Sequence, residues 1–211
     1  MTVKAILFDF DGVIAESVNV KTEAFRELFA NEAEHLPAIL SFHLANGGMS
    51  RFTKFEIIYR DFFNRPLSPQ KSEELGNRFS ELVKEKVVTS PYVPGALEFI
   101  EKYASSLPLF IASGTPHNEL IEILSRRNLD GFFCEAHGTP RTKIEIIQDI
   151  LERHHMTPVE MPFIGDAIND YKAAVEAGLP FYARVPLGAV NPFPSDIPVF
   201  PDLIELEHYL F

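Results

Sequence analysis

The 211-residue chain contains a single cysteine and no long apolar run near its start. With only Cys134, an intramolecular disulfide and a cysteine-rich metal site are both excluded, and the apolar residues around Cys134 predict a small buried side chain. The first apolar stretch is interrupted at Asp9, which leaves it too short for a signal peptide or a membrane-spanning helix. We therefore expect a cytoplasmic protein without a membrane partner.

Basic residues are also scarce. The chain has 19 Lys and Arg against 30 Asp and Glu, which gives a net charge of −11. Because few cations are available to neutralise a phosphate backbone, this balance argues against nucleic acid as a partner. The same charge repels small anions, so any phosphate-binding site needs a local cation.

Short apolar runs alternate with helical patterns along most of the sequence. Runs of this length, bounded by turn signals, are typical of buried strands in a parallel sheet. The runs lie at residues 3–8, 107–112, 132–134, 161–164 and 180–183, and the helical patterns at 95–103, 118–127, 143–155, 170–177 and 203–209. The alternation predicts an α/β fold with a mostly parallel sheet, in which ligands bind beyond the carboxyl ends of the strands.

One long segment departs from this alternation. Residues 15–89 contain helical patterns at 22–29, 52–63 and 73–87 but no convincing strand. We expect a helical cap at 15–89, inserted into a core made of residues 1–14 and 90–211. The prolines of residues 90–95 disfavour a helix and mark the connection back to the core.

Two acidic clusters follow predicted strands. In Asp9-Phe-Asp-Gly12, residues two apart in an extended chain point the same way, so Asp9 and Asp11 can reach one site. Two close carboxylates repel each other unless a cation lies beside them, and Gly12 lets the backbone turn closely around it. The second cluster, Gly165-Asp-Ala-Ile-Asn-Asp170, brings Asp166 and Asp170 to another strand end. Together these oxygens predict a magnesium site.

Two further sequence motifs are suited to binding an anionic ligand. Ser113-Gly-Thr-Pro-His117 places the Ser113 hydroxyl, Gly114 and free backbone N–H groups before a helix, where they can hold phosphate oxygens, and Thr115 can cap that helix. Lys143 opens the next long helix and can supply the local cation that the negative chain requires. The neighbouring residues alone leave an alternative open for each motif: an ordinary capped helix start at residues 113–117, and a solvated side chain at Lys143.

These four motifs, in this order, resemble the four sequence motifs of the haloacid dehalogenase superfamily in its phosphatase and phosphomutase branch. The resemblance implies a Rossmann-like core with an inserted, mobile, all-helical cap. It also implies that Asp9 attacks phosphorus to form an aspartyl-phosphate and that Asp11 protonates the leaving oxygen and then activates water. Ser113 and Lys143 would hold the transferring oxygens.

The same resemblance implies a magnesium cofactor. Its ligands would be the Asp9 carboxylate, the Asp11 carbonyl and Asp166, with Asp170 as a ligand or close neighbour. The implied activity is hydrolysis of a small phosphorylated metabolite, a sugar phosphate or similar monoester. The sequence does not indicate an oligomeric state.

Four alternatives remain beside this interpretation. Asp11 disfavours a dehalogenase, because a halide leaves without a proton. A sugar-phosphate mutase typically has a histidine ten residues after the second aspartate, where this chain has Lys21, and an acidic residue where it has Gly165. A phosphonatase would need an imine-forming cap lysine, for which Lys21 and Lys54 are candidates. A catalytically silent phosphate-sensing module would have been marked by loss of Asp9 or Asp11.

The predicted cap contains one unusual string, Asn46-Gly-Gly-Met-Ser-Arg-Phe52. Two glycines between helical segments permit a sharp loop, and Arg51 can reach from it to a substrate anion. A helix–helix turn with a solvated arginine is the alternative.

Overall fold

A six-stranded parallel sheet forms the centre of the computed structural model, which describes residues 2–211. Its strand order is β3-β2-β1-β4-β5-β6, and every neighbouring pair is parallel. The strands are β1 (Ile6–Phe8), β2 (Leu109–Pro116), β3 (Glu135–Thr139), β4 (Phe163–Gly165), β5 (Phe181–Arg184) and β6 (Val199–Phe200). The predicted α/β fold with a parallel sheet is confirmed.

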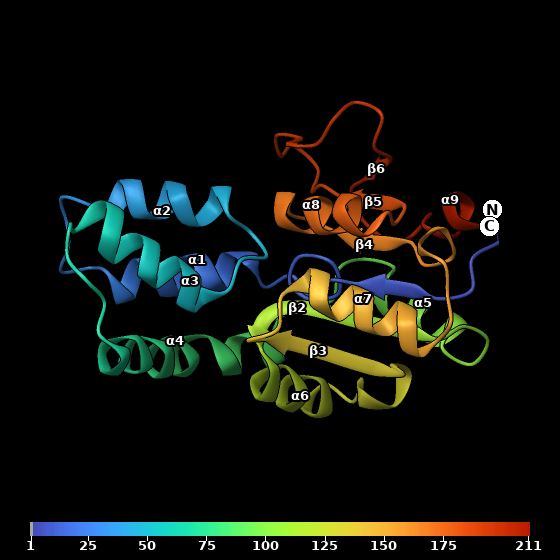
Figure 1. Ribbon diagram of the computed structural model, residues 1–211, viewed down its shortest axis with the longest axis horizontal. Helices are drawn as coiled ribbons and strands as arrows, with labels where there is room; N and C mark the ends of the chain where they lie inside the picture. The colour runs from blue at the N-terminus through green and yellow to red at the C-terminus, as the bar shows by residue number, and fades with distance from the viewer. Residues whose placement is uncertain (1) are drawn as a thin grey trace.

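Helices cover both faces of the sheet (Figure 1). Because side chains alternate along a strand, Leu7 packs with α7 (Lys143–Arg153) and α8 (Ile168–Ala177) on one face. Its neighbours Ile6 and Phe8 pack on the other face, which is covered by α5 (Ala96–Tyr103), α6 (His117–Arg126) and α9 (Glu207–Leu210). The central strand β1 is therefore buried from both sides, and its carboxyl end is a rigid support for the residues that follow it.

The segment between β1 and α5 is helical, as predicted. It contains α1 (Val18–Leu28), α2 (Leu36–Ala45), α3 (Arg51–Ile57), a π-helical turn (Ile58–Phe62) and α4 (Pro69–Thr89). Aromatic rings hold these helices together, since the ring centroid of Phe25 lies 5.8 Å from that of Phe55 and 5.1 Å from that of Phe79. The sequence patterns did not show α2, whose residues are apolar on most sides.

The two connections between this helical segment and the sheet run side by side. Ala15 forms a bridge with Tyr92. Glu16 N donates to the Pro91 carbonyl at 2.9 Å, and Val93 N donates to the Ile14 carbonyl at 3.0 Å. The chain thus enters and leaves the helical segment at one place, directly beyond the carboxyl end of β1.

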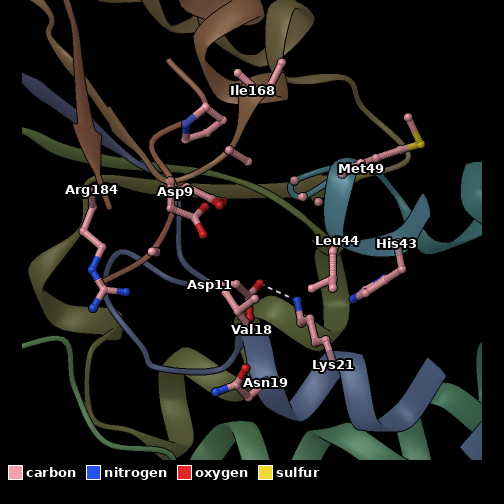
Figure 2. Close-up of a pocket in the computed structure, with 18 of the residues that line it drawn as sticks. Asp9, Asp11, Val18, Asn19, Lys21, His43, Leu44, Met49, Ile168 and Arg184 are labelled. Atoms are coloured by element: carbon pink, nitrogen blue, oxygen red, sulfur yellow. Dashed lines mark hydrogen bonds and ion pairs between the residues drawn. The ribbon is translucent and has the colours of Figure 1, made fainter. Parts of the chain in front are cut away.

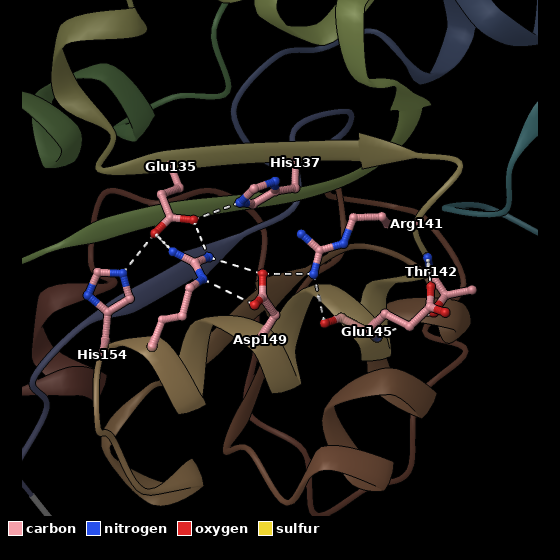
Figure 3. Close-up of polar contacts among 8 residues, drawn as sticks. Glu135, His137, Arg141, Thr142, Glu145, Asp149 and His154 are labelled. Atoms are coloured by element: carbon pink, nitrogen blue, oxygen red, sulfur yellow. Dashed lines mark hydrogen bonds and ion pairs between the residues drawn. The ribbon is translucent and has the colours of Figure 1, made fainter.

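The prediction of a strand at residues 132–134 was wrong. A short 3₁₀ turn, Asp130–Phe132, occupies that region, and the strand there is β3. Because β3 is an edge strand, it carries polar side chains: Glu135 accepts hydrogen bonds from Arg153 and His154 and contacts His137 (Figure 3). Cys134, expected to be buried, is exposed just before this edge. Another 3₁₀ turn, Pro158–Glu160, precedes β4.

The C-terminal region forms less helix than predicted. A helix was predicted at residues 203–209, but the helix found there, α9, is shorter and spans Glu207–Leu210. The short strand β6 was not predicted. Within residues 2–211, no helix combines the length and the apolar character needed to cross a membrane.

Candidate active site

Acidic side chains converge at the carboxyl ends of β1 and β4. Asp9 follows β1 directly, Asp166 follows β4, and Asp170 lies in the first turn of α8. One oxygen from each of the three carboxylates lies within 4.8 Å of the others. The two acidic clusters therefore lie close together, as predicted, because β1 and β4 are adjacent strands.

Lys143 is the cation of this cluster. Its side chain is buried, and Nζ lies 2.9 Å from Asp9 Oδ1 and 2.5 Å from Asp170 Oδ1. Asp170 is fully buried, and its Oδ2 also accepts from the backbone N–H groups of Ala167 at 3.1 Å and Asp166 at 3.3 Å. Lys143 and the amino end of α8 thus hold the Asp170 side chain in place.

The negative charge of Asp9 is less well balanced by its surroundings than that of the Asp170 side chain. The pKa of Asp9 is raised to about 7: burial raises it most, Lys143 opposes the shift, and Asp170 and Asp11 add to it. Burial, together with Asp9 and Asp170, raises the pKa of Asp166 well above its usual value. Three carboxylates and a single lysine leave an excess of negative charge, so Asp9 and Asp166 bind protons more readily than free carboxylates do where no further cation is present.

The donor set fits a divalent metal ion. Asp9, Asp166 and Asp170 bring three carboxylates to one place, where Lys143, 2.9 Å from Asp9 Oδ1, balances only part of their charge. The site offers only hard oxygen ligands, as magnesium requires. Gly12 has φ +81°, and a Cβ there would lie 2.2 Å from Asp166 Oδ2, so only glycine lets the backbone pass the carboxylate.

Asp11 points away from this cluster (Figure 2). Its carboxylate is paired with Lys21 and accepts from Ser17 Oγ at 2.6 Å and from Thr115 Oγ1 at 3.1 Å. Burial acts to raise the pKa of Asp11, but the charge and hydrogen bond of Lys21 and the two hydroxyls outweigh it, so the pKa lies below its usual value. Two nearby aspartates therefore have pKa values shifted in opposite directions.

The end of β2 brings its predicted residues to the same place. Ser113 is buried, and its Oγ accepts from Thr115 N at 3.1 Å. Thr115 does not cap the next helix as predicted, because the strand continues to Pro116 and α6 begins at His117. Its hydroxyl contacts Asp11 instead and accepts from Lys21 Nζ at 2.8 Å.

The glycine loop between α2 and α3 lies directly on the acidic cluster. Asn169 Nδ2 donates to the Gly47 carbonyl at 2.6 Å. A Cβ on Gly48, which has φ +70°, would lie 2.9 Å from Asp170 Oδ1, and a Cβ on Gly114 would lie 2.5 Å from the Gly48 carbonyl oxygen. Glycines on both sides allow this close approach, and the helical segment covers the site.

Arg51 does not have the expected free position. Its guanidinium forms two contacts with Glu119 of α6, at 2.5 and 3.1 Å, donates to Ser80 Oγ at 2.7 Å and lies over the Phe79 ring. Both side chains of the Arg51–Glu119 pair are almost fully buried, at 4% and 9% exposed. The arginine lines the cavity, but its charge is used to hold the helical segment against α6.

A cavity of about 480 Å³ connects the carboxylates with the helical segment (Figure 2). Three of its polar side chains were not assigned to a substrate site from the sequence: His43, Lys54 and Arg184. Arg184 pairs with Glu16 and donates to the Gly12 carbonyl at 3.2 Å. No local motif indicates Arg184 or His43, whereas Lys54 arose only as an imine candidate.

The fold and the site together define a class of enzymes, in which a Rossmann-like core carries an acidic site beneath a helical insertion. Residues 3–178 match the family model described as haloacid dehalogenase-like hydrolase. The chain belongs to this family, and it is an enzyme of the hydrolase class. The resemblance drawn from the four motifs is confirmed.

Several known proteins are similar to this chain. It is 26% identical over 200 residues to the phosphorylated carbohydrates phosphatase of Thermotoga maritima, covering 83% of this chain and 82% of the relative. A hydrolase from Pseudomonas syringae has 19% identity and a TM-score of 0.79, covering 98% of this chain and 97% of the other. The HAD-hydrolase YfnB from Bacillus subtilis, described as bound to magnesium and as revealing interdomain movement, has 19% identity and a TM-score of 0.71, covering 100% and 99%.

Proposed function

We propose that this protein is a magnesium-dependent phosphatase that hydrolyses small phosphorylated metabolites, a sugar phosphate or similar monoester. The observation that carries the proposal is geometric: Asp9, Asp166 and Asp170 converge beside Lys143 at the strand ends, and Asp11, two residues after Asp9, lines the same cavity. This arrangement places one carboxylate for attack and a second for proton transfer beside a cation-binding site. The phosphatase name of the Thermotoga maritima relative supports the same activity.

Asp9 is the proposed nucleophile. It attacks phosphorus, forms an aspartyl-phosphate and releases the alcohol, and water then attacks phosphorus to free phosphate and restore the carboxylate. Lys143 and Ser113, with the backbone at Gly114 and Thr115, hold the transferring oxygens as charge spreads over them. Lys143 lies 2.9 Å from Asp9, which supports this role.

Asp11 is the proposed proton carrier. Its carboxylate is held ionised by Lys21, which suits the second half of the reaction, in which a base accepts a proton from water. In the first half it must carry a proton to the leaving oxygen. An incoming phosphate dianion raises the pKa of a nearby carboxyl group, so the substrate itself favours that protonated form.

Asp9, Asp166, Asp170 and the backbone carbonyl of Asp11 are the groups that would hold magnesium. When bound, the metal supplies positive charge against the transferring phosphoryl group and the crowded carboxylates. We further propose the division into a core of residues 1–14 and 90–211 and a cap of residues 15–89. The adjacent connections at Ala15 and Tyr92 support one shared hinge.

Product analysis by phosphorus NMR tests the function. A hexose 1-phosphate or similar monoester, with magnesium and wild-type protein, should yield free phosphate steadily and without a bisphosphate primer. Accumulation of the hexose 6-phosphate, dependent on such a primer, would identify a sugar-phosphate mutase instead. Lys21, at the place where the mutases typically have a histidine, supports hydrolysis, because a charged lysine is a poor neutral proton relay near pH 7.

A further inference from the structure

The helical wall of the cavity contains a buried lysine that faces the site from α3. Lys54 is 4% exposed, and His43, from α2, is 6% exposed. Lys54 Nζ lies 3.1 Å from His43 Nδ1 and donates to the His43 carbonyl at 3.1 Å. Both residues line the cavity that also contains Asp9, and Figure 2 shows His43 across that cavity from the carboxylates.

Lys54 differs from the other buried cations around this cavity. Arg51 is paired with Glu119, Lys143 with Asp9 and Asp170, and Arg184 with Glu16. Among the described residues 2–211, no carboxylate forms an ion pair with Lys54. A buried ammonium group without a counterion is costly, so burial favours the neutral amine until an anion enters the cavity and stabilises the charged form.

The local electrostatics agree with a missing anion. Burial, together with Lys21, lowers the pKa of Lys54 to about 7, with Asp166 and Asp11 opposing the shift from across the cavity. Burial and the charge of Lys54 lower the pKa of His43 to about 3, so this imidazole is neutral. A protonated Lys54 can only donate to His43 Nδ1, and in that state the imidazole proton is on Nε2, which gives a second donor beside the lysine.

We propose that Lys54, positioned by His43, binds a carboxylate at the end of the substrate remote from the transferred phosphoryl group. The preferred substrate is then a phosphate monoester of a small hydroxycarboxylic acid. This inference rests on the proposed phosphatase function. One ammonium group balances a single carboxylate charge, whereas a second phosphate would bring up to two charges to one lysine and a neutral histidine.

The remaining wall of the cavity is consistent with a short substrate. Phe25 lies below the lysine, with Nζ 5.6 Å from its ring centroid, and Phe79, Leu44 and Met49 add further apolar surface. These side chains give the space around the ammonium group a partly apolar lining. In that setting a charge-assisted hydrogen bond to a carboxylate is stronger than it would be in water.

The test uses the full-length protein with magnesium and matched pairs of substrates. Phosphate monoesters of two-, three- and four-carbon hydroxy acids are each compared with the neutral alcohol phosphate of equal length. The wild type should prefer the acid of the best-fitting length by at least about tenfold in kcat/KM. A bisphosphate of the same length forms a third arm, and its preference over the acid would overturn the carboxylate assignment.

Lys54→Met removes the charge but keeps a long apolar side chain. It should lower kcat/KM for the acid by about 10- to 100-fold, chiefly through KM, and leave the neutral substrate within about threefold. Lys54→Arg should retain part of the preference. Lys86→Met, an exposed lysine of the same helical segment, is the matched control and should change neither substrate. Equal losses on acid and neutral substrates by Lys54→Met would show a structural role and overturn the proposal.

Failure of the two proposals can be told apart. Phosphate release from monoesters without any preference for the acid refutes the carboxylate site alone. If no monoester is hydrolysed, the phosphatase proposal fails, and calorimetry of the acids against Asp9→Asn and Asp9→Asn/Lys54→Met still decides the binding site. Tighter binding to the first variant by about tenfold supports the site, and equal binding overturns it.

Discussion

Replacement of Asp9 by asparagine should stabilise the metal-free protein at neutral and alkaline pH while it abolishes turnover. The asparagine keeps the shape of the side chain but removes one negative charge from a cluster of three carboxylates and one lysine. In the absence of magnesium that charge is repelled by its neighbours and penalised by burial. Loss of the charge therefore helps folding, although the nucleophile is lost.

The size of the effect follows from the pKa of Asp9, which rises from 3.8 to about 7 on folding. Between these values folded Asp9 binds more protons than it does in the unfolded chain, so its contribution to wild-type stability falls as pH rises from about 4 to 7 and stays low above it. A shift of about three pKa units corresponds to about 4 kcal/mol, since each unit is worth 1.36 kcal/mol. Asp9→Asn lacks this penalty and should gain up to that amount at pH 8, but little at pH 4.

The assay is urea unfolding of both proteins in chelator, at a series of pH values from 4 to 8. The difference between them cancels the titration of groups that do not interact with Asp9, and Asp166, whose pKa Asp9 helps to raise, contributes in the same direction. Asp11→Asn is the matched control: its carboxylate is stabilised by Lys21, so its loss should destabilise the protein by about 1–3 kcal/mol at pH 8. If Asp9→Asn is less stable than wild type at pH 8 in chelator, the charge balance derived for the site is wrong.

Three further perturbations follow from the contacts of the site. Magnesium should raise the melting temperature of the wild type more than that of Asp9→Asn, and calcium should bind but inhibit; full activity in excess chelator would contradict this. Gly48→Ala should lower kcat/KM by roughly tenfold or more, because φ +70° and the contact with Asp170 force the loop away, whereas Gly131→Ala, with no atom within 4 Å, should be neutral. Arg51→Ala should destabilise the protein by about 3–5 kcal/mol, because it removes the cation that is paired with the buried Glu119. The double variant Arg51→Ala/Glu119→Ala should recover part of that stability. An unchanged urea midpoint with a raised KM would instead indicate that Arg51 binds the substrate.

The sequence predicts the sheet and the acidic centre well because both depend on local patterns. The buried strands β1, β2 and β4 are short apolar runs, and the residues just after them must lie at one edge of a parallel sheet. Asp9 and Asp166 could therefore be placed together before any coordinates. The contrast between Asp9 and Asp11 could not, because it depends on Lys21 and Lys143 approaching from other elements.

The errors fall where tertiary contacts decide the outcome. The edge strand β3 was missed because its polar side chains serve a network with α7 rather than a core, and Cys134 was misjudged for the same reason. The ion pair of Arg51 was not indicated by the sequence, because its partner Glu119 lies 68 positions further along the chain. A residue's charge can be read from the sequence, but its partner cannot.

The most direct test of the central claim is detection of the covalent intermediate on Asp9. Wild-type protein with magnesium is mixed with a monoester carrying radiolabelled phosphate, quenched in acid within milliseconds and digested. We expect transient label on the peptide that contains Asp9, released by hydroxylamine as an acyl phosphate is, and no label in Asp9→Asn. Phosphate release by the wild type without any labelled protein at any quench time, or with label on another peptide, would contradict the role of Asp9 as nucleophile.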